Sequence, residues 1–412
     1  MRCEVVAVGT ELLLGQIVDT NSAYIGEQLA LVGIDSYFQT KVGDNWGRIK
    51  ECLELALSRS DAVIVCGGLG PTQDDITRDV IAEVMGVELR RDPELEARIR
   101  AMFGARGRFM PDNNLRQADV PEGAKVMDQM PGTAPGLICP VGDKVIYAVP
   151  GVPWEMREMI TGSVIPDLKQ RAGITGAIRS RVLRTWGQSE SGLAEMLAGY
   201  HEDLERSGRC TLAFLASGVE GLKIRLTAKA ATAEEAHAIL DREVAVVADA
   251  LGDLVFSLDD EPMEKVVLDL CESRGFSLAV AESMTGGLIC ERITSIPGSS
   301  RVFRGGIVSY ASDVKSAVLG VPQGPVVSED AAVAMARGVC ELLKADVSVA
   351  VTGVAGPDEQ EGQPVGTAWL ATCVGGDAGA VQVRLPGDRE RIRQFATISV
   401  LNLLRLRLAP RR

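Results

Sequence analysis

Short apolar runs alternate with amphipathic stretches along the first 170 residues. Apolar runs bounded by turn residues are typical of buried strands, and apolar residues spaced three and four apart are typical of helices. The predicted strands cover residues 3–9, 37–42, 61–66 and 145–149, and the predicted helices cover 19–31, 49–57, 76–85 and 153–168. This alternation indicates a parallel sheet with helices on its faces.

The pattern changes after Gly173. Strands are predicted over 179–185, 211–215 and 222–230, and helices over 189–197 and 233–251. These elements indicate a small antiparallel α+β module, which we interpret as structural or interdomain. Its segment Gly218 to Gly221 superficially matches the GxxG loop of KH domains, and the module can be described as KH-like. The segment lies between two predicted strands and contains Glu220, which favours a hairpin turn over an RNA-binding loop.

Strands and helices alternate again after the linker-like LDDEP, residues 258–262. The predicted elements are helix 261–274, strand 276–281, helix 287–294, strand 306–309, helices 313–319 and 328–343, strands 347–351, 367–374 and 381–385, and a last helix after residue 389. The fold class is therefore α/β: two separate α/β domains with mainly parallel sheets, joined by a small α+β module. The boundaries expected are 1–173, 174–257 and 258–412.

Composition narrows the classes of function. A chain of 412 residues is too long for one ordinary core, and its net charge of -13 argues against direct nucleic-acid binding while leaving small anionic ligands open. Met1 leads almost directly into a strand and no apolar run approaches a membrane span, so we expect no membrane contact and a cytoplasmic location. The nine cysteines are scattered and never spaced as CxxC, which favours buried thiols in a reducing compartment.

The stretch AESMTGG, residues 281–287, is the most informative in the last domain. It places Ser283 where a buried strand is followed by a helix, and Gly286 and Gly287 are expected to leave the first helical amides open to a ligand. A serine is a weak nucleophile at neutral pH unless a neighbouring base accepts its proton. The identity of that base therefore decides whether Ser283 can be catalytic.

Histidine is an improbable base, because the only two histidines, His201 and His237, lie in the middle module. The remaining candidates between Ser283 and the last helix are Lys315 and Lys344, and Lys344 ends a helix that looks exposed.

Lys315 follows Tyr310 at the end of a predicted strand. Loops at the carboxyl ends of parallel strands face one crevice, which would bring Ser283, Tyr310, Lys315 and Thr352 together in an arrangement that suits acyl transfer. Burial or a nearby cation such as Arg389 would have to lower the lysine pKa from about 10.4. The alternative is that Lys315 is a solvated helix lysine and Ser283 a helix cap.

A glycine-rich loop, GGLGPTQDD, covers residues 67–75 of the first domain. Its backbone amides would suit a phosphate group, and Asp74 and Asp75 would supply oxygen ligands for a divalent cation. Alternatively the glycines make a tight turn and Asp74 or Asp75 caps the following helix. The loop is neither a Walker A motif nor a GxGxxG fingerprint.

These motifs together resemble the CinA (competence/damage-inducible protein A) family from end to end. The matching stretches are GTELLLG, VGDN, GGLGPTQDD, GTAPG, PGVP, AESMTGG, SY with a downstream lysine, TGVAGPD, VGT and GDR. The resemblance implies a first domain similar to the molybdopterin-binding fold, a small middle domain and a C-terminal nicotinamide-nucleotide amidase of the PncC type. Met284 departs from the cysteine that is usual in these amidases, and the loop 358–364 is variable in the family.

For the C-terminal domain the resemblance implies deamidation of nicotinamide mononucleotide to nicotinate mononucleotide and ammonia, without a metal. Ser283 would attack the carboxamide, Lys315 would accept its proton and pass it to the ammonia, and Tyr310 would orient or stabilise. The implied binding residues are Gly286 and Gly287 for the oxyanion or phosphate, Arg389 for the phosphate, and Thr352 and Gly353 for the ring.

For the first domain the resemblance implies a pyrophosphatase that converts ADP-ribose to AMP and ribose 5-phosphate with a divalent metal, Mg, Mn or Co. The implied metal or water-positioning residues are Thr10, Glu11, Asp44 and Asp75, and the implied phosphate cradle is Gly68, Gly70 and Thr72. The domain could instead only bind a nucleotide or a pterin-like ligand. We expect small nucleotides as partners and a homodimer; the alternative for the whole chain is a non-enzymatic interaction protein in DNA uptake or damage response.

Overall fold

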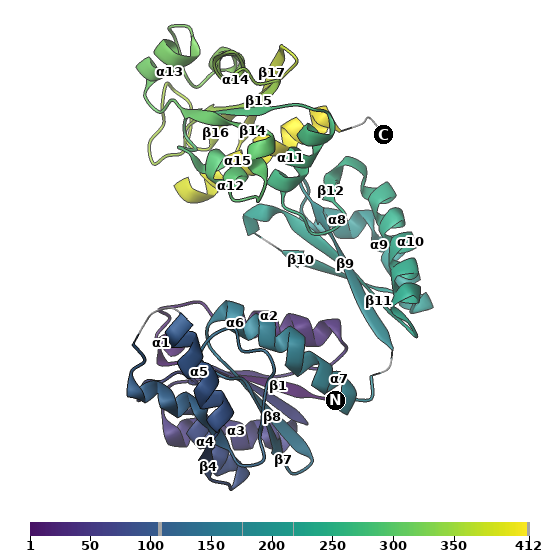
Figure 1. Cartoon of the computed structure of the whole chain (residues 1–412). Coiled ribbons are helices and arrows are strands. Elements are labelled where there is room, and N and C mark those ends of the chain that lie inside the picture. The colour runs from purple at the N-terminus through teal and green to yellow at the C-terminus, as the bar shows by residue number, and fades with distance from the viewer. Residues whose placement is uncertain (106–108, 175, 217, 410–412) are drawn as a thin grey trace. The chain divides into compact units, whose positions relative to one another are not determined.

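The protein is described here by a computed structural model, which covers residues 1–105, 109–174, 176–216 and 218–409. The chain forms two compact units (Figure 1). One contains Met1–Arg179 and Lys229–Ala236, and the other contains Ser180–Ala228 and His237–Arg412. Most of the middle module thus belongs to the same compact unit as the C-terminal domain.

The first domain is built on a six-stranded sheet in the order β2-β1-β3-β8-β7-β6. Its elements are β1 (Cys3–Val8), α1 (Thr10–Leu13), α2 (Thr20–Leu31), β2 (Gln39–Val42), α3 (Trp46–Arg59), β3 (Ala62–Cys66), α4 (Thr77–Met85), β4 (Leu89–Arg91), α5 (Pro93–Ala105), η1 (Asp112–Ala118), β5 (Asp119–Pro121), β6 (Lys125–Val126), β7 (Leu137–Val141), β8 (Lys144–Val149), α6 (Pro153–Met159), η2 (Ile160–Val164) and α7 (Ile165–Arg171). β2, β1, β3 and β8 pair in parallel, whereas β7 and β6 are antiparallel.

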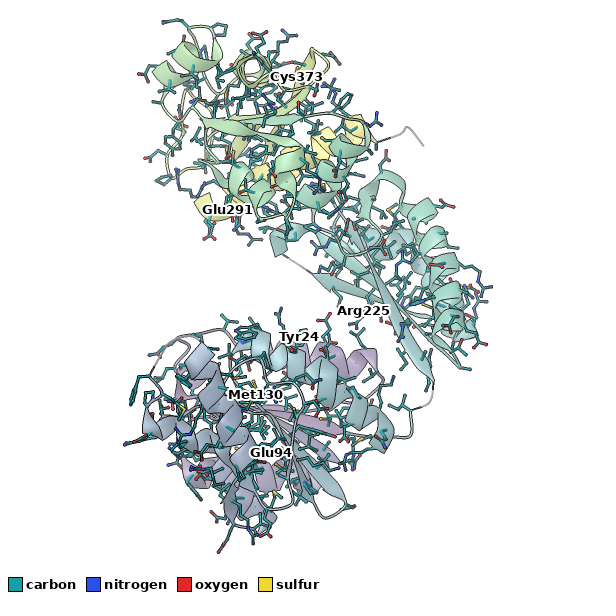
Figure 2. The ribbon with its side chains drawn as sticks, in the orientation of Figure 1. Tyr24, Glu94, Met130, Arg225, Glu291 and Cys373 are labelled. Carbon is teal, nitrogen blue, oxygen red and sulfur yellow. The ribbon has the colours of Figure 1, made fainter. Side chains whose placement is uncertain are left out.

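Helices cover both faces of this sheet, as the alternating pattern predicts (Figure 1). One core lies under α3, α4 and α5 and includes Met130, which is labelled in Figure 2. The other core lies under α2, α6 and α7. The start of α2 follows from its sequence, because the Asp19 side chain accepts a hydrogen bond from the Ser22 amide at 2.9 Å.

The sequence pattern missed the insertion between α4 and β8. There α5 packs near a separate two-stranded sheet of β4 and β5, and β7 returns antiparallel to β8. These strands are short, and β7 contains Pro140, which a strand tolerates only near an edge or an irregularity. Short strands with proline give too weak a periodic signal for recognition from sequence.

The middle module has a four-stranded sheet in the order β10-β11-β9-β12. Its elements are β9 (Ala177–Thr185), α8 (Glu190–Met196), α9 (Ala198–Ser207), β10 (Thr211–Ala216), η3 (Gly218–Glu220), β11 (Leu222–Ala230), α10 (Ala233–Leu251), η4 (Gly252–Leu254) and β12 (Val255–Ser257). β10 and β11 pair antiparallel, and η3 lies between them, at the place where the hairpin turn was predicted.

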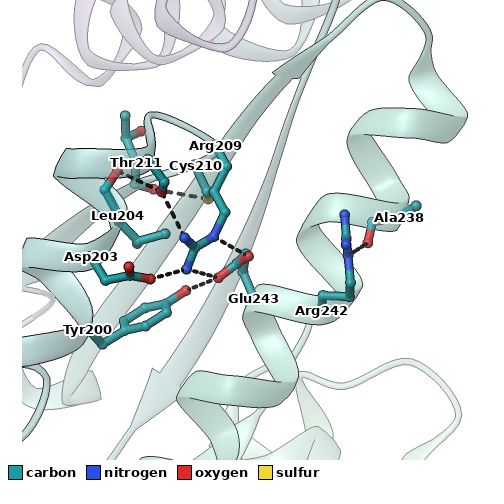
Figure 3. Close-up of polar contacts among 10 residues, drawn as sticks. Tyr200, Asp203, Leu204, Arg209, Cys210, Thr211, Ala238, Arg242 and Glu243 are labelled. Atoms are coloured by element: carbon teal, nitrogen blue, oxygen red, sulfur yellow. Dashed lines mark hydrogen bonds and ion pairs between the residues drawn. The ribbon is translucent and has the colours of Figure 1, made fainter.

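A polar network joins three elements of the middle module (Figure 3). Arg209 donates from Nε to Glu243 at 2.8 Å and from Nη2 to Asp203 at 2.6 Å, and the Tyr200 hydroxyl donates to Glu243 at 2.7 Å. These contacts tie α9 and the start of β10 to α10. The helix predicted over 189–197 corresponds to α8, and the sequence pattern misses α9, which follows α8 after a single residue.

The C-terminal domain has a five-stranded sheet in the order β14-β13-β15-β16-β17. Its elements are α11 (Met263–Ser273), β13 (Leu278–Glu282), α12 (Leu288–Thr294), η5 (Ser299–Arg301), β14 (Phe303–Val308), α13 (Ser312–Leu319), α14 (Glu329–Leu343), β15 (Val347–Gly353), β16 (Thr367–Val374), β17 (Asp377–Arg384) and α15 (Arg389–Leu408). α11, α12 and α15 pack on one core and α13 and α14 lie over the other (Figure 1).

The predicted α/β fold class is confirmed, with one refinement in this sheet. β13 pairs in parallel with β14 and β15, whereas β15, β16 and β17 form an antiparallel meander. β16 and β17 are joined by the turn at Gly375 and Gly376, which is too short for a crossover helix. The parallel strands therefore occupy only the half of the sheet that carries the AESMTGG turn.

The LDDEP segment is packed, although the sequence suggested a plain linker. Asp260 forms ion pairs with Arg184 at 2.6 Å and with Lys223 at 2.9 Å, and Asp259 pairs with Arg181 at 2.8 Å. The acidic residues that looked typical of a solvated linker therefore hold it against the middle module.

The structure also bears on two expectations from composition, the burial of the cysteines and the lack of a membrane-spanning segment. Six of the nine cysteines are buried, but Cys52, Cys290 and Cys340 are only partly buried, so the expectation of buried thiols was wrong for these three. No helix in the described part of the chain combines the length and the apolar character needed to cross a membrane.

Candidate functional sites

The AESMTGG turn lies where the sequence predicted, between β13 and α12. The Ser283 amide donates to the carbonyl of Val351 at 3.0 Å, which fixes the turn against the neighbouring strand β15. Gly286 and Gly287 have φ of 60° and 97°, a region in which a residue with a side chain is strained. Two left-handed residues in sequence reverse the chain so that Ser283 remains at the sheet edge and α12 starts behind it.

Ser283 opens onto a cavity of about 120 Å³ at this edge of the sheet. The cavity is lined by Ser283, Met284, Tyr310, Lys315, Val326, Val327, Thr352, Gly353, Val354, Ala355, Gly356, Asp358, Gln360 and Arg389. Ser283, Tyr310 and Thr352 follow or end the three parallel strands β13, β14 and β15. The structure thus brings together the four residues that the sheet-edge argument grouped, with Gly353 and Arg389 beside them.

Lys315 is buried, with only 2% of its surface exposed. Its Nζ donates to the carbonyl of Tyr310 at 3.1 Å, and burial lowers the pKa of its ammonium although the Glu361 carboxylate acts in the opposite direction. The alternative of a solvated helix lysine is therefore wrong. Ser283 is not a helix cap either, because α12 starts from Gly287 without a side-chain cap.

Tyr310 and Arg389 are in direct contact at the mouth of the cavity. Arg389 donates from Nη2 to the Tyr310 hydroxyl and from Nη1 to the carbonyl of Gly356, both at 2.6 Å. Because Tyr310 is 57% exposed, this pair faces solvent and can meet an entering ligand. Arg389 is the first residue of α15 and is presented there by the cap at Asp388.

The inner wall of the cavity is formed by Thr352, Gly353 and the segment before α14. Thr352 Oγ1 donates to the carbonyl of Val326 at 2.7 Å. A side chain at Gly353 would lie 2.5 Å from the Thr367 carbonyl oxygen and 2.6 Å from Met284 Sδ. Met284, the residue that departs from the family pattern, therefore lies against the cavity wall.

The structure overturns the assignment of the Gly286 and Gly287 amides as ligand donors. The Gly286 amide donates to the Ser283 carbonyl at 3.1 Å, and the Gly287 amide donates to the Glu282 carboxylate at 2.9 Å. Glu282 is fully buried and also accepts from the amides of Ile289 and Cys290, at 3.1 and 2.9 Å. The start of α12 is already occupied by a carboxylate of the protein itself, which leaves no room for a ligand anion there.

The loop 358–364, which the sequence analysis treats only as variable, contributes to the site. Asp358 and Gln360 line the cavity, and the Glu361 carboxylate accepts from the amides of Val326 and Val327 at 3.1 and 3.0 Å. Glu361 thereby holds the wall segment from the side opposite Thr352. The only available signal was the position of Asp358 directly after TGVAGP, at the end of a buried strand.

The glycine-rich loop of the first domain borders a second cavity, of about 570 Å³. Of the residues predicted there, Glu11, Asp44, Gly68, Gly70 and Asp75 line it, together with Asp74, Gln117 and Glu155. The glycines are required by close packing, because a side chain at Gly68 would lie 2.1 Å from Thr77 Oγ1. The structure thus brings most of the predicted residues of this domain around one space.

Thr10 and Thr72 have other roles than those expected. Thr10 donates to Asp44 from its amide and its hydroxyl, both at 2.8 Å, and Thr72 donates to Asp75 from its amide at 2.8 Å and from its hydroxyl. The Thr72 amide is therefore not open to a phosphate group; the two threonines orient the two carboxylates. The helix-cap alternative is wrong as well, since α4 follows Ile76 without a side-chain cap.

A preformed metal cage is not found. Among the residues that the structure describes, no group of three or more His, Cys, Asp or Glu side chains is placed to hold a metal ion. A magnesium ion that arrives with a diphosphate, however, needs only one or two protein carboxylates, since phosphate oxygens and waters fill its other positions. Asp44 and Asp75, each oriented by a threonine, fit that more modest requirement.

Two cations behind the loop were missed by sequence reasoning. Arg78 is 1% exposed and donates to the carbonyl of Leu69 at 2.9 Å, and burial lowers its pKa. Arg116 donates to the carbonyl of Thr72 at 2.8 Å. Both guanidinium groups hold carbonyls of the glycine-rich loop, which favours an anionic ligand on its other side. Arg78 lies on the buried side of the amphipathic helix α4. From sequence alone, the guanidinium group of an arginine in a helix is expected to reach solvent.

Three family models match consecutive parts of the chain, and together they define its class. They are described as "Probable molybdopterin binding domain" over residues 4–170, "Damage-inducible protein CinA KH domain" over 180–257 and "CinA C-terminal domain" over 260–408. The chain is thus an α/β protein with a molybdopterin-binding type of domain, a KH module and a CinA C-terminal domain.

Two relatives match nearly the whole length of the chain. A CinA-like protein of Frankia casuarinae is 48% identical, over 99% of this chain and 96% of its own length. A CinA-like protein of Dictyoglomus thermophilum is 40% identical, over 98% of both. A crystal structure of CinA from Thermoplasma acidophilum is 37% identical with a TM-score of 0.37, over 39% of this chain and 94% of that one. The chain belongs to the CinA family.

Proposed function

We propose that the C-terminal domain is a serine–lysine amidase that converts nicotinamide mononucleotide to nicotinate mononucleotide and ammonia. The observation that supports this most is the buried Lys315, whose pKa is lowered by burial and whose side chain lines the same cavity as Ser283. Among the described residues, Lys315 has no acidic hydrogen-bond partner. A lysine buried in this way is costly for a fold and suits a general base.

The proposed reaction has two halves. Ser283 Oγ attacks the carboxamide carbon while neutral Lys315 Nζ accepts the hydroxyl proton. The lysine then gives this proton to the amine as the carbon–nitrogen bond breaks, which leaves an ester on Ser283 and releases ammonia. Water next attacks the ester, Lys315 takes a proton from the water and returns it to Ser283 Oγ, and the carboxylate product leaves.

The other residues of the cavity bind and orient. Tyr310 and Arg389 meet the substrate at the mouth, with Arg389 on the phosphate group, while Thr352 and Gly353 border the pyridine ring. The amidase proposal as a whole is tested most directly by removing the nucleophile, Ser283.

The test uses the full chain with nicotinamide mononucleotide in the presence of a chelator, and measures ammonia release. We expect Ser283→Ala to lower the rate by at least about 1,000-fold, because the covalent route is lost. Ser312→Ala, an exposed serine at the start of α13, is the matched control and should retain full activity. Wild-type protein that releases no ammonia, or a Ser283→Ala protein as active as the wild type, would refute the amidase.

For the first domain we propose a hydrolase that splits ADP-ribose into AMP and ribose 5-phosphate with a divalent metal. The support is the cavity that combines the oriented carboxylates of Asp44 and Asp75 with a glycine-rich loop backed by Arg78. The metal would be held by Asp44 and Asp75 together with the diphosphate, where it would polarise the phosphoryl group and activate water.

ADP-ribose with magnesium, manganese or cobalt tests this second activity through the AMP formed. Asp75→Ala should abolish AMP formation, whereas Asp143→Ala, an exposed carboxylate in the turn between β7 and β8, should leave it unchanged. Binding of ADP-ribose by the wild type without any AMP would favour the alternative, a domain that only binds a nucleotide or pterin-like ligand.

A further inference from the structure

We propose that Arg393 is a second phosphate-binding residue of the C-terminal site, and that Arg389 and Arg393 together select phosphorylated over unphosphorylated ligands. This inference rests on the proposed amidase function and adds a specificity determinant to it. Its starting point is the finding that Glu282 occupies the start of α12, where a phosphate would ordinarily be expected.

Arg389 and Arg393 are four residues apart in α15, so their side chains project from the same face of the helix. Arg389 contacts the Tyr310 hydroxyl, and Arg393 Nη2 donates to the carbonyl of Thr285 at 2.6 Å. Both guanidinium groups are therefore held at the loops that carry the proposed catalytic residues.

Gly286 shows how close the second arginine comes to the cavity mouth. A methyl group added at Gly286 would lie 3.6 Å from Arg393 Nη2 and 3.9 Å from Tyr310 Cε2. The tyrosine ring and the guanidinium group thus flank the same glycine. Because Gly286 has no side chain, a methyl-sized space lies between them, next to the cavity that Tyr310 lines.

The charges around this position favour an anion. Neither Arg389 nor Arg393 forms an ion pair within the described residues. The neighbouring acids have other hydrogen bonds, since Asp388 caps α15 through the Arg391 amide and Glu390 accepts from Gln394. Two acids of the loop after β15 lie near the cavity: Asp358 lines it, and the Glu361 carboxylate accepts from the amides of Val326 and Val327.

Arg393 has the donors for this role. A guanidinium group carries five N–H donors, and only the Nη2 contact to Thr285 is used by the described residues. Paired N–H donors match two oxygens of a phosphate, which makes arginine better suited than lysine to such a contact. Two guanidinium groups would recognise the dianionic phosphate of a mononucleotide and gain nothing from a neutral nucleoside.

The experiment compares the wild type with Arg393→Gln and Arg393→Lys, using nicotinamide mononucleotide and nicotinamide riboside as substrates. We expect Arg393→Gln to raise KM for the mononucleotide by about 10-fold to 100-fold with kcat changed less than about twofold, which is the loss of one charged hydrogen-bonded contact. The value of kcat/KM for the riboside should not change. Arg393→Lys should give an intermediate KM.

Arg391→Gln is the matched control, because Arg391 lies on the same helix but stacks on Phe395, and its KM should equal that of the wild type. Titration of Ser283→Ala protein, with and without Arg393→Gln, by the mononucleotide gives affinity independently of turnover. Thermal unfolding of each variant shows whether the Thr285 contact is needed for folding; if Arg393→Gln is unfolded, Arg393→Lys provides the comparison.

The outcomes separate this inference from the function on which it rests. A wild type that does not deamidate the mononucleotide refutes the proposed function. An active wild type whose folded Arg393 variants keep the same KM and affinity refutes only the role of Arg393. Equal losses on mononucleotide and riboside would likewise overturn it, since they would indicate a disturbed Ser283 turn in place of a lost phosphate contact.

Discussion

In the proposed amidase mechanism, Lys315 is the general base of the C-terminal site. Its side chain is buried and lines the same cavity as Ser283, Tyr310 and Arg389, and among the described residues its Nζ donates only to a main-chain carbonyl. A charged lysine in such a place costs stability, whereas a neutral one is a competent base. The same burial that weakens the fold would therefore suit Lys315 for the proton transfer that we propose.

Lys315→Met separates these two consequences. Because the folded-state pKa of Lys315 lies below its unfolded value, the unfolded chain binds more protons between the two pKa values, and the stability of the wild type rises with pH in that window. Replacement by methionine removes this dependence. Thermal unfolding should show that the stability of Lys315→Met relative to wild type is greatest at neutral pH and shrinks as pH approaches about 10.5.

The activity of Lys315→Met should be lower than that of the wild type, although its stability at neutral pH should be higher. Lys315→Met should lose at least about 100-fold in ammonia release, the usual contribution of a general base. In the wild type, kcat/KM should rise with pH to a plateau reached below the ordinary lysine pKa of 10.5, because only the neutral amine accepts a proton. A variant with wild-type activity, or a stability difference independent of pH, would contradict this account of Lys315.

At the scale of elements, the turn from β13 to α12 depends on one buried carboxylate. Glu282 ends the strand and accepts hydrogen bonds from three amides at the start of the helix. Such a carboxylate neutralises the positive end of a helix and satisfies donors that would otherwise be buried without partners. It thereby fixes the direction in which Ser283 faces the cavity.

Glu282→Gln should lower the stability of the second compact unit. The amide group has one acceptor oxygen in place of two and no charge, so at least one buried amide loses its partner, at a cost of about 2–4 kcal/mol. This corresponds to a fall in Tm of roughly 5–10 °C for a unit of this size. Calorimetry of the full chain measures it.

Glu291→Gln is the matched control, because Glu291 lies exposed on the same helix and is labelled in Figure 2. Its Tm should stay within about 1 °C of the wild type, since surface changes cost little. Equal melting temperatures for Glu282→Gln and wild type would mean that the three contacts contribute no net stability.

At the scale of the whole molecule, most of the middle module and the C-terminal domain share one compact unit. Arg405, which is buried near the end of α15, donates to the carbonyl of Asp253 at 2.6 Å and to that of Val255 at 3.3 Å. Arg292 of α12 contacts Glu220 of the middle module at 2.8 Å and Glu264 of α11 at 2.5 Å. The middle module is thus attached to α12, which follows the Ser283 turn, and to α15, which carries Arg389 and Arg393.

We therefore expect two calorimetric transitions for the full chain, with the middle module melting together with the C-terminal domain. Arg405→Met should lower only the second unit's transition, by roughly 5–10 °C, because two buried carbonyl oxygens lose a charged donor. Arg384→Met, an exposed arginine of β17, is the control. A shift of both transitions, or a separate third transition for the module, would contradict this division.

The sequence by itself determined most of the long helices and buried strands, but not the short strands β4 to β7, α5 or α9. The predicted elements depend on residues that are close in sequence: the periodic apolar pattern, the caps at Asp19 and Ser328 and the turn glycines. They can therefore be recognised without knowledge of the tertiary structure. The grouping of Ser283, Tyr310, Lys315 and Thr352 could be predicted for a related reason. A parallel arrangement places the carboxyl ends of strands at one edge, whatever packs around them.

Only the tertiary structure decided which polar groups are already engaged. The carboxylate of Glu282 fills the helix start that Gly286 and Gly287 were expected to offer, Thr72 is bonded to Asp75, and Arg393 reaches Thr285 from 108 residues away. A donor's availability depends on neighbours brought in by packing, and the burial that lowers the pKa of Lys315 is likewise a property of the packed cavity. Local sequence patterns cannot predict the availability of a donor or the burial of Lys315, because both depend on segments that come into contact only when the chain has folded.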